Sequence, residues 1–275
     1  MHILLDLGNS RLKMAAIAAN NTQELTAQIA IHYEEIEKIA QWLRCLSKPP
    51  KKAYGVSVAQ PTAVQTTEAM FAAHNCSIQW LKADNPSPYI YNDYENLEHL
   101  GPDRWFGALG AMKAYLPQQN QGLLYCSFGT ATTIDAIVPS HSKKHRKPWR
   151  FIGGLILPGP YLMHQLLNQH TARLSMGHGQ LQDFPKNTVN AITSGMAAAQ
   201  IGALVQQILK VQQLCPKYPV RLICAGGGWP LVQKALEKTL QHWPIHYRSP
   251  RPELHYYPHA VLQGLASIIN KTTAT

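Results

Sequence analysis

The sequence contains no long apolar run: none approaches the roughly 18–20 consecutive apolar residues that a membrane-spanning helix requires. The chain begins directly on a strand-like segment, residues 1–5, so we expect neither a signal peptide nor a membrane partner. Its 5 cysteines stand at scattered positions, and no Cys/His spacing typical of a zinc site occurs. These absences argue against a disulfide framework and indicate a protein of the reducing cytoplasm.

Two familiar nucleotide-binding signatures are missing as well. The chain has no Walker sequence, in which a glycine-rich loop ends in Lys and Ser or Thr. The three glycines at 226–228 do not match a Rossmann fingerprint, because the spacing differs and no acid follows at the right distance. Any nucleotide-binding function must therefore rest on other patterns.

Acidic residues are scarce: 15 Asp and Glu stand against 25 Lys and Arg, which gives a formal net charge of +10 at pH 7. Such an excess suits either nucleic acid or a site for anionic small molecules. Part of it lies in residues 141–150, between two strand-like patterns, which predicts a long hairpin loop. We interpret this loop as a solvated one, and contact with a phosphate or a partner is the alternative.

The composition is that of a globular protein, 45% hydrophobic over 275 residues, enough for one large domain or two of ordinary size. Strand-like and helix-like periodicities alternate in both halves. We expect strands near 2–7, 11–18, 26–32, 53–58, 77–82, 150–157, 220–225 and 245–248. We expect helices over 33–43, 61–74, 102–115, 160–170, 188–214, 229–240 and from about 258. This order predicts a duplicated α/β fold with domains 1–118 and 119–275, packed tightly at the boundary near 116–122.

One short pattern occurs twice. Residues 3–10 and 123–131 each form an apolar strand and a tight turn with glycine and hydroxyl or amide side chains, and a second β-prone run follows. Glycine permits φ > 0 and close approach of a ligand, and successive N–H groups in such a turn form an anion-binding concavity. Two copies predict two related domains that face one phosphate-bearing ligand.

In the first copy, Asp6 ends an apolar strand beside the turn Gly8-Asn9-Ser10. A carboxylate there can hold a hydrated Mg²⁺ on a polyphosphate, while the turn amides bind phosphate oxygens. Lys13 is a candidate point charge for a phosphate in transfer. The alternative is a plain β-hairpin with an Asx-type turn, in which Lys13 is a surface strand residue. Because a second turn exists, we favour phosphate binding.

The second copy surrounds its glycine with hydroxyl side chains, from Ser127 to Thr133. Threonine is also ordinary in strands, so the glycine–threonine turn is the more specific part of the signal. The candidates for phosphate contacts are Gly129, Thr130, Ala131 and Thr132. Asp135 alternates with Ile134 along the following strand, so we expect it to face solvent.

A third site of close backbone approach follows the apolar strand 220–225. Gly226 and Gly227 stand there directly before a predicted helix. They either let the backbone pack against an adenine or simply turn the chain. We favour the nucleotide, because two other phosphate turns are present.

The segment Gly101-Pro102-Asp103-Arg104 opens a predicted helix. Proline suits the first helical turn, and an acid there complements the helix dipole. Taken alone, the segment is therefore explained by helix capping. Together with the phosphate turns, Asp103 becomes a candidate general base and Arg104 a candidate clamp for a carboxylate or phosphate.

Together these motifs resemble those of type III pantothenate kinases in identity, order and spacing. The resemblance spans essentially the whole chain and is carried by residues 6–10, 100–104, 129–135, 153–159, 171–174 and 187–195. More broadly, the chain is similar to the actin/hexokinase/Hsp70-like superfamily. The resemblance implies an α/β fold of two ribonuclease-H-like (actin-like ATPase) domains, with mixed sheets flanked by helices, that clasp ATP.

The resemblance further implies an enzyme that uses ATP and Mg²⁺ to phosphorylate pantothenate to 4'-phosphopantothenate, the first step of coenzyme A biosynthesis. It implies Asp103 as the base that faces the pantothenate hydroxyl. On the phosphate and metal side it implies Asp6, Gly8, Asn9, Lys13 and the turn from Gly129 to Thr132. Around pantothenate it implies Tyr94, Gly101, Pro102, Arg104 and Thr188. Because that pocket lies at a dimer interface in the family, a homodimer is implied.

Two positions depart from the family pattern. Ser127 stands where the family usually has an acid that helps to hold a monovalent cation, K⁺ or NH₄⁺. Serine removes that charge, so we expect little or no dependence on this cation. Leu97 stands where the family usually has proline, and this change of loop stiffness should affect the chemistry little.

Two rival hypotheses remain. One is another phosphotransferase of the same superfamily, or a phosphatase, which would need a placed water instead of a pocket for an alcohol. The other is a degenerate regulatory or nucleic-acid-binding relative, which only the positive charge and the basic loop support. The presence of Asp6, Asp103 and both turns argues against the second, so we do not expect nucleic acid as a partner.

Overall fold

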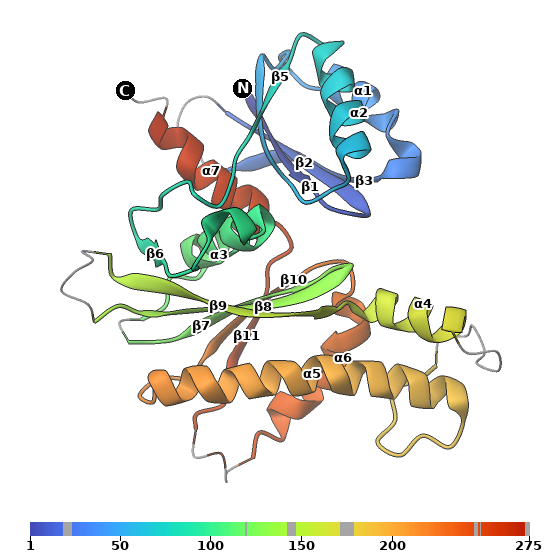
Figure 1. The fold of residues 1–275 in the computed structure, drawn as a ribbon, viewed down its shortest axis with the longest axis vertical. Coiled ribbons are helices and arrows are strands. Elements are labelled where there is room, and N and C mark those ends of the chain that lie inside the picture. The colour runs from blue at the N-terminus through green and yellow to red at the C-terminus, as the bar shows by residue number, and fades with distance from the viewer. Residues whose placement is uncertain are drawn as a thin grey trace. The chain divides into compact units, whose positions relative to one another are not determined.

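The structure, a computed structural model, describes residues 1–18, 24–118, 120–141, 147–170, 179–244, 247 and 249–272. The chain forms two compact units (Figure 1). The first unit combines Met1–Leu116 with His259–Thr275, and the second unit is Pro117–Pro258. The expected boundary near 116–122 therefore agrees with the first crossing of the chain from one unit to the other.

The first unit is built on a mixed sheet. Its strands are β1 (His2–Leu7), β2 (Arg11–Ile17), β3 (Leu25–His32), β4 (Lys52–Ser57) and β5 (Ser77–Trp80). They are ordered β3-β2-β1-β4-β5. The strands β1 to β3 form an antiparallel meander, whereas β4 runs parallel to β1 and β5 parallel to β4. The central β1 is buried from residue 3 to residue 7, as expected of an inner strand covered on both faces.

Helices and short elements complete the first unit. They are α1 (Lys38–Arg44), α2 (Pro61–Ala72), α3 (Pro102–Ala114), α7 (Ala260–Thr272), the 3-10 turns Tyr33–Glu35 and Leu97–His99, and the short strand β6 (Ile90–Asn92). The helix predicted over 33–43 is thus interrupted, because α1 begins only at Lys38. Ile39 and Trp42 of α1 and Phe71 of α2 pack with the sheet into one core.

The C-terminal helix α7 lies in the first unit, against the prediction that it belongs to a domain 119–275. It packs along α3 with very close backbones. A Cβ on Gly110 would lie 1.8 Å from the Ala260 carbonyl oxygen, and a Cβ on Gly264 would lie 1.9 Å from that of Phe106. Only glycine permits this approach, so paired glycines far apart in sequence hold the returning chain on the first unit.

The second unit repeats the same topology. Its strands are β7 (Leu123–Phe128), β8 (Ala131–Pro139), β9 (Trp149–Pro158), β10 (Arg221–Ala225) and β11 (Glu253–Tyr256). They are adjacent in the order β11-β10-β7-β8-β9. The first three form an antiparallel meander, and β10 and β11 run parallel to β7. The duplicated α/β fold with mixed sheets and flanking helices is therefore confirmed.

The described residues of the second unit include three α-helices: α4 (Pro160–His170), α5 (Thr188–Leu214) and α6 (Trp229–Gln241). Figure 1 shows α5 and α6 along one face of its sheet. Leu204 and Ile208 of α5 form a core there with Leu236 of α6 and Leu222 of β10. Apolar side chains at helical spacing on α5 and at strand spacing on β10 thus meet, as their periodicities predict.

The helix α5 also corrects one expectation. Among the described residues it is long and apolar enough, by length and composition alone, to span a membrane, with a mean hydropathy of 1.2 over its best window. Two of its glutamines make side-chain hydrogen bonds inside the unit: Gln200 Nε2 donates to the Pro158 carbonyl at 2.8 Å, and Gln212 Nε2 donates to that of Tyr218 at 2.9 Å. Within that window 22% is buried, and these two amides lie on the side of α5 that packs on its own unit.

The remaining expectations concern the connections. The strands β8 and β9 are antiparallel, with Pro139 opposite Trp149, so the basic segment 141–150 spans a hairpin as predicted. Its residues 142–146, the motif residues 171–174 and most of the strand expected at 245–248 lie outside the described residues. The strand that pairs with β10 is β11, which begins only at Glu253.

Candidate active site

The first candidate phosphate turn is the hairpin between β1 and β2. Asp6 and Lys13 lie opposite each other in the antiparallel register, and Lys13 Nζ is 3.1 Å from Asp6 Oδ2. Asp6 is only 6% exposed. The ion pair therefore places one carboxylate and one ammonium beside the turn, the two charges that a metal-bound polyphosphate needs.

The backbone of this turn is that of a hairpin, which was the plainer of the two interpretations. The Gly8 amide donates to the Arg11 carbonyl at 3.0 Å and is therefore used inside the turn. Asn9 and Ser10 lie exposed at its tip. Of the three residues expected to present amides to a phosphate, these two are the ones at the surface.

Two residues near the turn were not predicted. The Tyr33 hydroxyl donates to the Gly8 carbonyl. Burial and, second, the Asp6 carboxylate raise the pKa of Tyr33 to about 12, so this hydroxyl stays a donor at neutral pH. Burial and the nearby Lys13 ammonium lower the pKa of His259, which precedes α7. No sequence signal connects residues 33 or 259 with the turn, because their proximity arises from the fold.

The second candidate turn is the hairpin between β7 and β8. The Gly129 amide donates to the Ala131 carbonyl at 3.0 Å, and the Gly159 amide donates to the Thr130 carbonyl at 2.9 Å. A Cβ on Gly159 would lie 2.0 Å from the Gly129 carbonyl oxygen. The segment that follows β9 is therefore held directly against this hairpin.

The glycine run after β10 also contacts the hairpin between β7 and β8. The Gly228 amide donates to the Phe128 carbonyl at 2.7 Å. Gly226 has φ 98°, and a Cβ on it would lie 2.4 Å from the Phe128 carbonyl oxygen, so only glycine fits. Gly227 is exposed. Three turns thus converge at the carboxyl ends of the parallel strands β7 and β10, the edge at which open α/β sheets bind ligands.

Thr132 lies in β8 beside the second turn. Its side chain is buried, and its Oγ1 has no hydrogen-bond partner among the described residues. Because the whole residue is 0% exposed, the backbone of the turn, and not this hydroxyl, is the part that a ligand can reach. Ser127, at the end of β7, is half-buried.

Asp135 differs from expectation. It is fully buried, 0% exposed, and does not face solvent. The strand β8 lies between β7 and β9, and it is buried from Thr132 to Val138, so both faces are covered. The alternation with Ile134 therefore carries no information about exposure here.

The first turn of α3 holds the candidate base. Asp103 is half-buried in the first turn, and its Oδ1 accepts a hydrogen bond from the Arg104 amide at 2.9 Å, whereas the N-cap is Gly101, which makes no side-chain cap bond. A Cβ on Gly101 would lie 2.7 Å from the same oxygen, so glycine leaves room for the carboxylate. Pro102 occupies the first turn as expected. The backbone thus fixes the direction of the Asp103 carboxylate.

Arg104 and Tyr94 are brought together, as the resemblance implies. Arg104 is 4% exposed, and its guanidinium carbon lies 5.6 Å from the centroid of the Tyr94 ring. Its Nη1 donates to the Tyr94 hydroxyl at 3.4 Å. The next residue, Trp105, ties the helix to the preceding loop, because its Nε1 donates to the Asn85 carbonyl at 3.0 Å. A buried, oriented guanidinium of this kind suits the recognition of a carboxylate.

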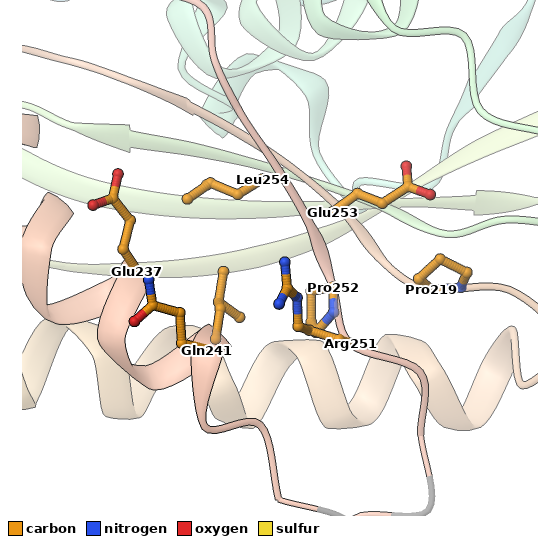
Figure 2. A pocket seen from close by; sticks show the side chains of 8 residues that line it. Pro219, Glu237, Gln241, Arg251, Pro252, Glu253 and Leu254 are labelled. Carbon is orange, nitrogen blue, oxygen red and sulfur yellow. The ribbon is translucent and has the colours of Figure 1, made fainter.

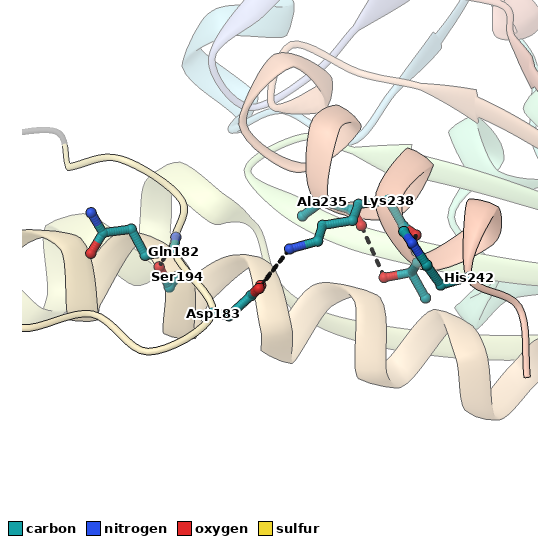
Figure 3. Close-up of polar contacts among 7 residues, drawn as sticks. Gln182, Asp183, Ser194, Ala235, Lys238 and His242 are labelled. Atoms are coloured by element: carbon teal, nitrogen blue, oxygen red, sulfur yellow. Dashed lines mark hydrogen bonds and ion pairs between the residues drawn. The ribbon is translucent and has the colours of Figure 1, made fainter.

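Thr188 opens α5 in the second unit and is exposed. The segment before it is fastened to two helices (Figure 3). The Gln182 amide donates to Ser194 Oγ of α5 at 3.0 Å, and Asp183 Oδ1 lies 2.6 Å from Lys238 Nζ of α6. These contacts hold the segment that leads to Thr188 against α5 and α6, although this segment lies on the surface.

A hollow of about 480 Å³ lies at the other end of the second unit's sheet (Figure 2). Glu237 of α6 and Glu253 of β11 line it together with Arg251. Because Glu253 begins β11, the hollow is at the amino ends of the parallel strands, and Arg221 Nη2 binds Glu253 Oε2 there at 2.8 Å. It is therefore separate from the edge where the turns converge.

The Mg²⁺ expected with ATP needs few ligands from the protein. Among the described residues, no three His, Cys, Asp or Glu side chains gather as a metal cage. Mg²⁺ on a nucleotide needs no such cage, since it binds through one or two carboxylates, phosphate oxygens and water. Asp6, buried beside the first turn, fits that requirement.

Comparison with known proteins gives a consistent result. The family model for type III pantothenate kinases matches residues 2–210. The type III pantothenate kinase of Bordetella bronchiseptica is 38% identical over 271 residues, which cover 98% of this chain and 97% of the relative. That of Methylibium petroleiphilum is 32% identical over 234 residues, which cover 84% of this chain and 89% of the relative.

Solved structures agree on the fold. A conserved putative Baf family transcriptional activator from Campylobacter jejuni has a TM-score of 0.56 at 17% identity, over 99% of this chain and all of that one. A putative 2-dehydro-3-deoxygalactonokinase from Sinorhizobium meliloti has a TM-score of 0.53 at 13% identity, over 98% of this chain and 96% of that one. Identities this low show the fold alone. The family match and the near full-length identity to curated relatives establish that the chain belongs to the type III pantothenate kinase family.

Proposed function

We propose that this protein transfers the γ-phosphoryl group of ATP to the primary hydroxyl of pantothenate and so forms 4'-phosphopantothenate for coenzyme A biosynthesis. The observation that carries the proposal is the 38% identity to a type III pantothenate kinase over 98% of the chain. The residues that the chemistry needs, above all Asp6 and Asp103, are present in this sequence.

Asp103 is the proposed base. Phosphoryl transfer passes through a loose transition state, so positioning and charge neutralisation do most of the work, and the hydroxyl proton leaves late. The Arg104 amide holds one carboxylate oxygen of Asp103 at 2.9 Å. The carboxylate can therefore accept the proton without first having to find its orientation.

Arg104 is the proposed partner of the pantothenate carboxylate, because a guanidinium binds a carboxylate through paired hydrogen bonds. Tyr94 stacks against that guanidinium and limits its rotamers. Gly101, Pro102 and Thr188 are proposed as further lining of the pantothenate pocket. Thr188 contributes a hydroxyl from the start of α5, where it is exposed.

Asp6 and Lys13 are proposed for the phosphate and metal side of the first unit, with Gly8, Asn9 and Ser10. When bound, Mg²⁺ would neutralise charge on the phosphates, and Asp6 would hold it. Lys13, which now pairs with Asp6 at 3.1 Å, would place its ammonium on the phosphate in transfer. The Tyr33 bond to Gly8 keeps the turn in place.

The second unit is proposed to bind phosphate and nucleotide with its converging turns. The convergence of these turns at the carboxyl ends of β7 and β10 supports this proposal, with the Gly228 amide bound to the Phe128 carbonyl at 2.7 Å; Thr132 is proposed there with them. The other proposed contacts are Gly129, Thr130, Ala131, Gly226 and Gly227. We propose little or no role for K⁺ or NH₄⁺, because Ser127 offers a neutral hydroxyl where the family usually has an acid.

A homodimer is also proposed. The outward side of α5 is small and apolar, with Ala191, Gly195, Ala198 and Gly202 exposed. A Cβ built on Gly195 or on Gly202 meets nothing within 4 Å. Phe184, just before α5, is 89% exposed. An apolar surface left uncovered by its own chain is typical of an interface.

We propose that the enzyme works in the cytoplasm. All 5 cysteines are free. Cys126 and Cys224 even lie opposite each other on β7 and β10 and remain thiols. Unlinked cysteines in this position are typical of a reducing compartment.

A coupled assay tests the proposed reaction. ADP release should require pantothenate, ATP and Mg²⁺ together, and the product should carry the phosphate on the pantothenate hydroxyl. ATP hydrolysis that is equally fast without pantothenate would contradict the proposal and favour a phosphatase.

A further inference from the structure

Three aromatic rings lie in a row beside the turns of the second unit. Phe128 ends β7 directly before Gly129, and its ring centroid is 5.9 Å from that of Trp229. Trp229 in turn stacks on Tyr256, with centroids 5.6 Å apart and ring planes at 13°. The row thus leads from the second phosphate turn to a ring at the surface.

The fold places the last ring of this row at the ligand edge of the sheet. Tyr256 ends β11 and lies opposite Cys224 in the parallel register with β10. Leu254, two residues earlier and so on the same face of the strand, packs on the core with α6. Trp229 opens α6 directly after the glycine run. Tyr256 is therefore close to Gly226–Gly228 without being near them in sequence.

The exposure of the three rings differs sharply. Phe128 and Trp229 are buried, whereas Tyr256 is 47% exposed. Trp229 stacks on the Tyr256 ring, and about half of the Tyr256 residue remains open to solvent. A half-exposed ring that is held in place by a buried indole can stack with another flat aromatic group.

We infer that Tyr256, supported from behind by Trp229, is the platform on which the purine base of the nucleotide stacks. This inference rests on the proposed function, since it assigns the base of the ATP whose phosphates occupy the adjacent turns. The glycine run Gly226–Gly228 lets the part of the nucleotide that joins the base to the phosphates lie close to the protein. Tyr256 therefore contributes to the affinity for ATP through the base, whereas Asp6 acts at the metal and phosphates and Asp103 at the transfer step.

The variant Tyr256→Ala tests the inference. Loss of one base–aromatic stack should weaken ATP binding about tenfold in calorimetry and raise KM for ATP by a similar factor. The kcat and the KM for pantothenate should stay the same. Tyr256→Phe keeps the ring and should bind ATP like the unmodified protein. Tyr256→Leu covers Trp229 without a ring and should lose affinity like the alanine variant, which separates stacking from any loss of folding.

Two controls define the result. Tyr218, at the amino end of β10, is in the same unit but at the opposite edge, and Tyr218→Ala should leave ATP affinity unchanged. Inorganic tripolyphosphate has no base, so its inhibition constant against ATP should be equal in the Tyr256 variants and the unmodified protein. Equal weakening of ATP and tripolyphosphate would overturn the inference, because Tyr256 would then act on the phosphate turns.

The same measurements separate this inference from the proposed function. If the protein phosphorylates pantothenate but folded Tyr256→Ala and Tyr256→Leu bind ATP normally, only the inference fails. If the protein does not phosphorylate pantothenate but binds ATP, the function fails, and the calorimetric effect of the variants still decides the role of Tyr256.

Discussion

Replacing Asp103 by asparagine should remove catalysis and leave the fold intact. The structure gives the reason for the second part. Asp103 Oδ1 accepts a hydrogen bond from the Arg104 amide at 2.9 Å, and the amide oxygen of asparagine can accept the same bond. Asparagine is tolerated in the first turn of a helix, although it lacks the negative charge that the helix dipole favours there. The change therefore removes the proton acceptor but keeps the contact with the backbone.

The expected magnitudes differ for rate and for stability. Loss of a general base lowers kcat by roughly 10²–10⁴, which corresponds to about 3–5 kcal/mol of activation free energy. Asp103→Asn should leave the melting temperature within about 1–2 °C of the unmodified protein. Asp103→Ala also loses the bond to the Arg104 amide, so about 1 kcal/mol of stability should go with it and lower the melting temperature by about 2–4 °C.

The pair of variants separates the two roles. Both should show the same fall of kcat in the coupled assay, while only the alanine variant should melt earlier in calorimetry. The KM for ATP should change little, because no step of nucleotide binding uses Asp103. Near-normal turnover in a folded Asp103→Asn protein would refute the reasoning and remove Asp103 from the mechanism.

Four further outcomes are expected. Asp6→Asn should weaken Mg²⁺–ATP binding and turnover more than pantothenate binding, and unchanged affinity for Mg²⁺–ATP in calorimetry would make Asp6 structural. Activity should respond weakly or not at all to K⁺ at constant ionic strength, and Ser127→Asp should increase the response; a large, saturable activation of the unmodified protein would contradict this. Sedimentation at working concentration should show a dimer, and an active monomer would end that proposal. Burial is the main cause that lowers the pKa of His2, His255 and His259, so the unfolded chain takes up protons first below about pH 6.5. Stability should therefore fall as the pH drops from 7 to 5, and a constant melting temperature over that range would contradict the assignment.

Most elements of the fold follow from local patterns. The strand and helix expected at 2–7 and 188–214 occur as β1 and α5, because their periodicities and bounding residues are local properties of the chain. The candidate residues of both turns were also identifiable, since glycine next to hydroxyl or amide groups after an apolar strand is a short-range signal. Such signals do not show which distant segment of the chain packs against each turn. Gly159 against Gly129, and Gly226 against Phe128, are close approaches that only coordinates reveal.

Two of the wrong expectations, those for Asp135 and for α7, have one cause. Asp135 was expected at the surface because alternation in a strand normally separates the two faces, but β8 is covered on both. The helix α7 was assigned to the half of the chain in which it lies, whereas its glycine contact with α3 returns it to the first unit. In both cases the environment of a residue depends on elements far away in the sequence.

The sequence alone determined the family and the duplicated α/β fold, and it supplied the residues proposed for phosphate, proton and carboxylate chemistry, because these depend on residue types at short spacings. The tertiary structure decided which distant groups support them. Tyr33 reaches Gly8, His259 lies near Lys13, and Trp229 holds Tyr256 at the edge of the turns. Such contacts join residues separated by long stretches of chain, and the free energy of packing, not any local preference, selects them.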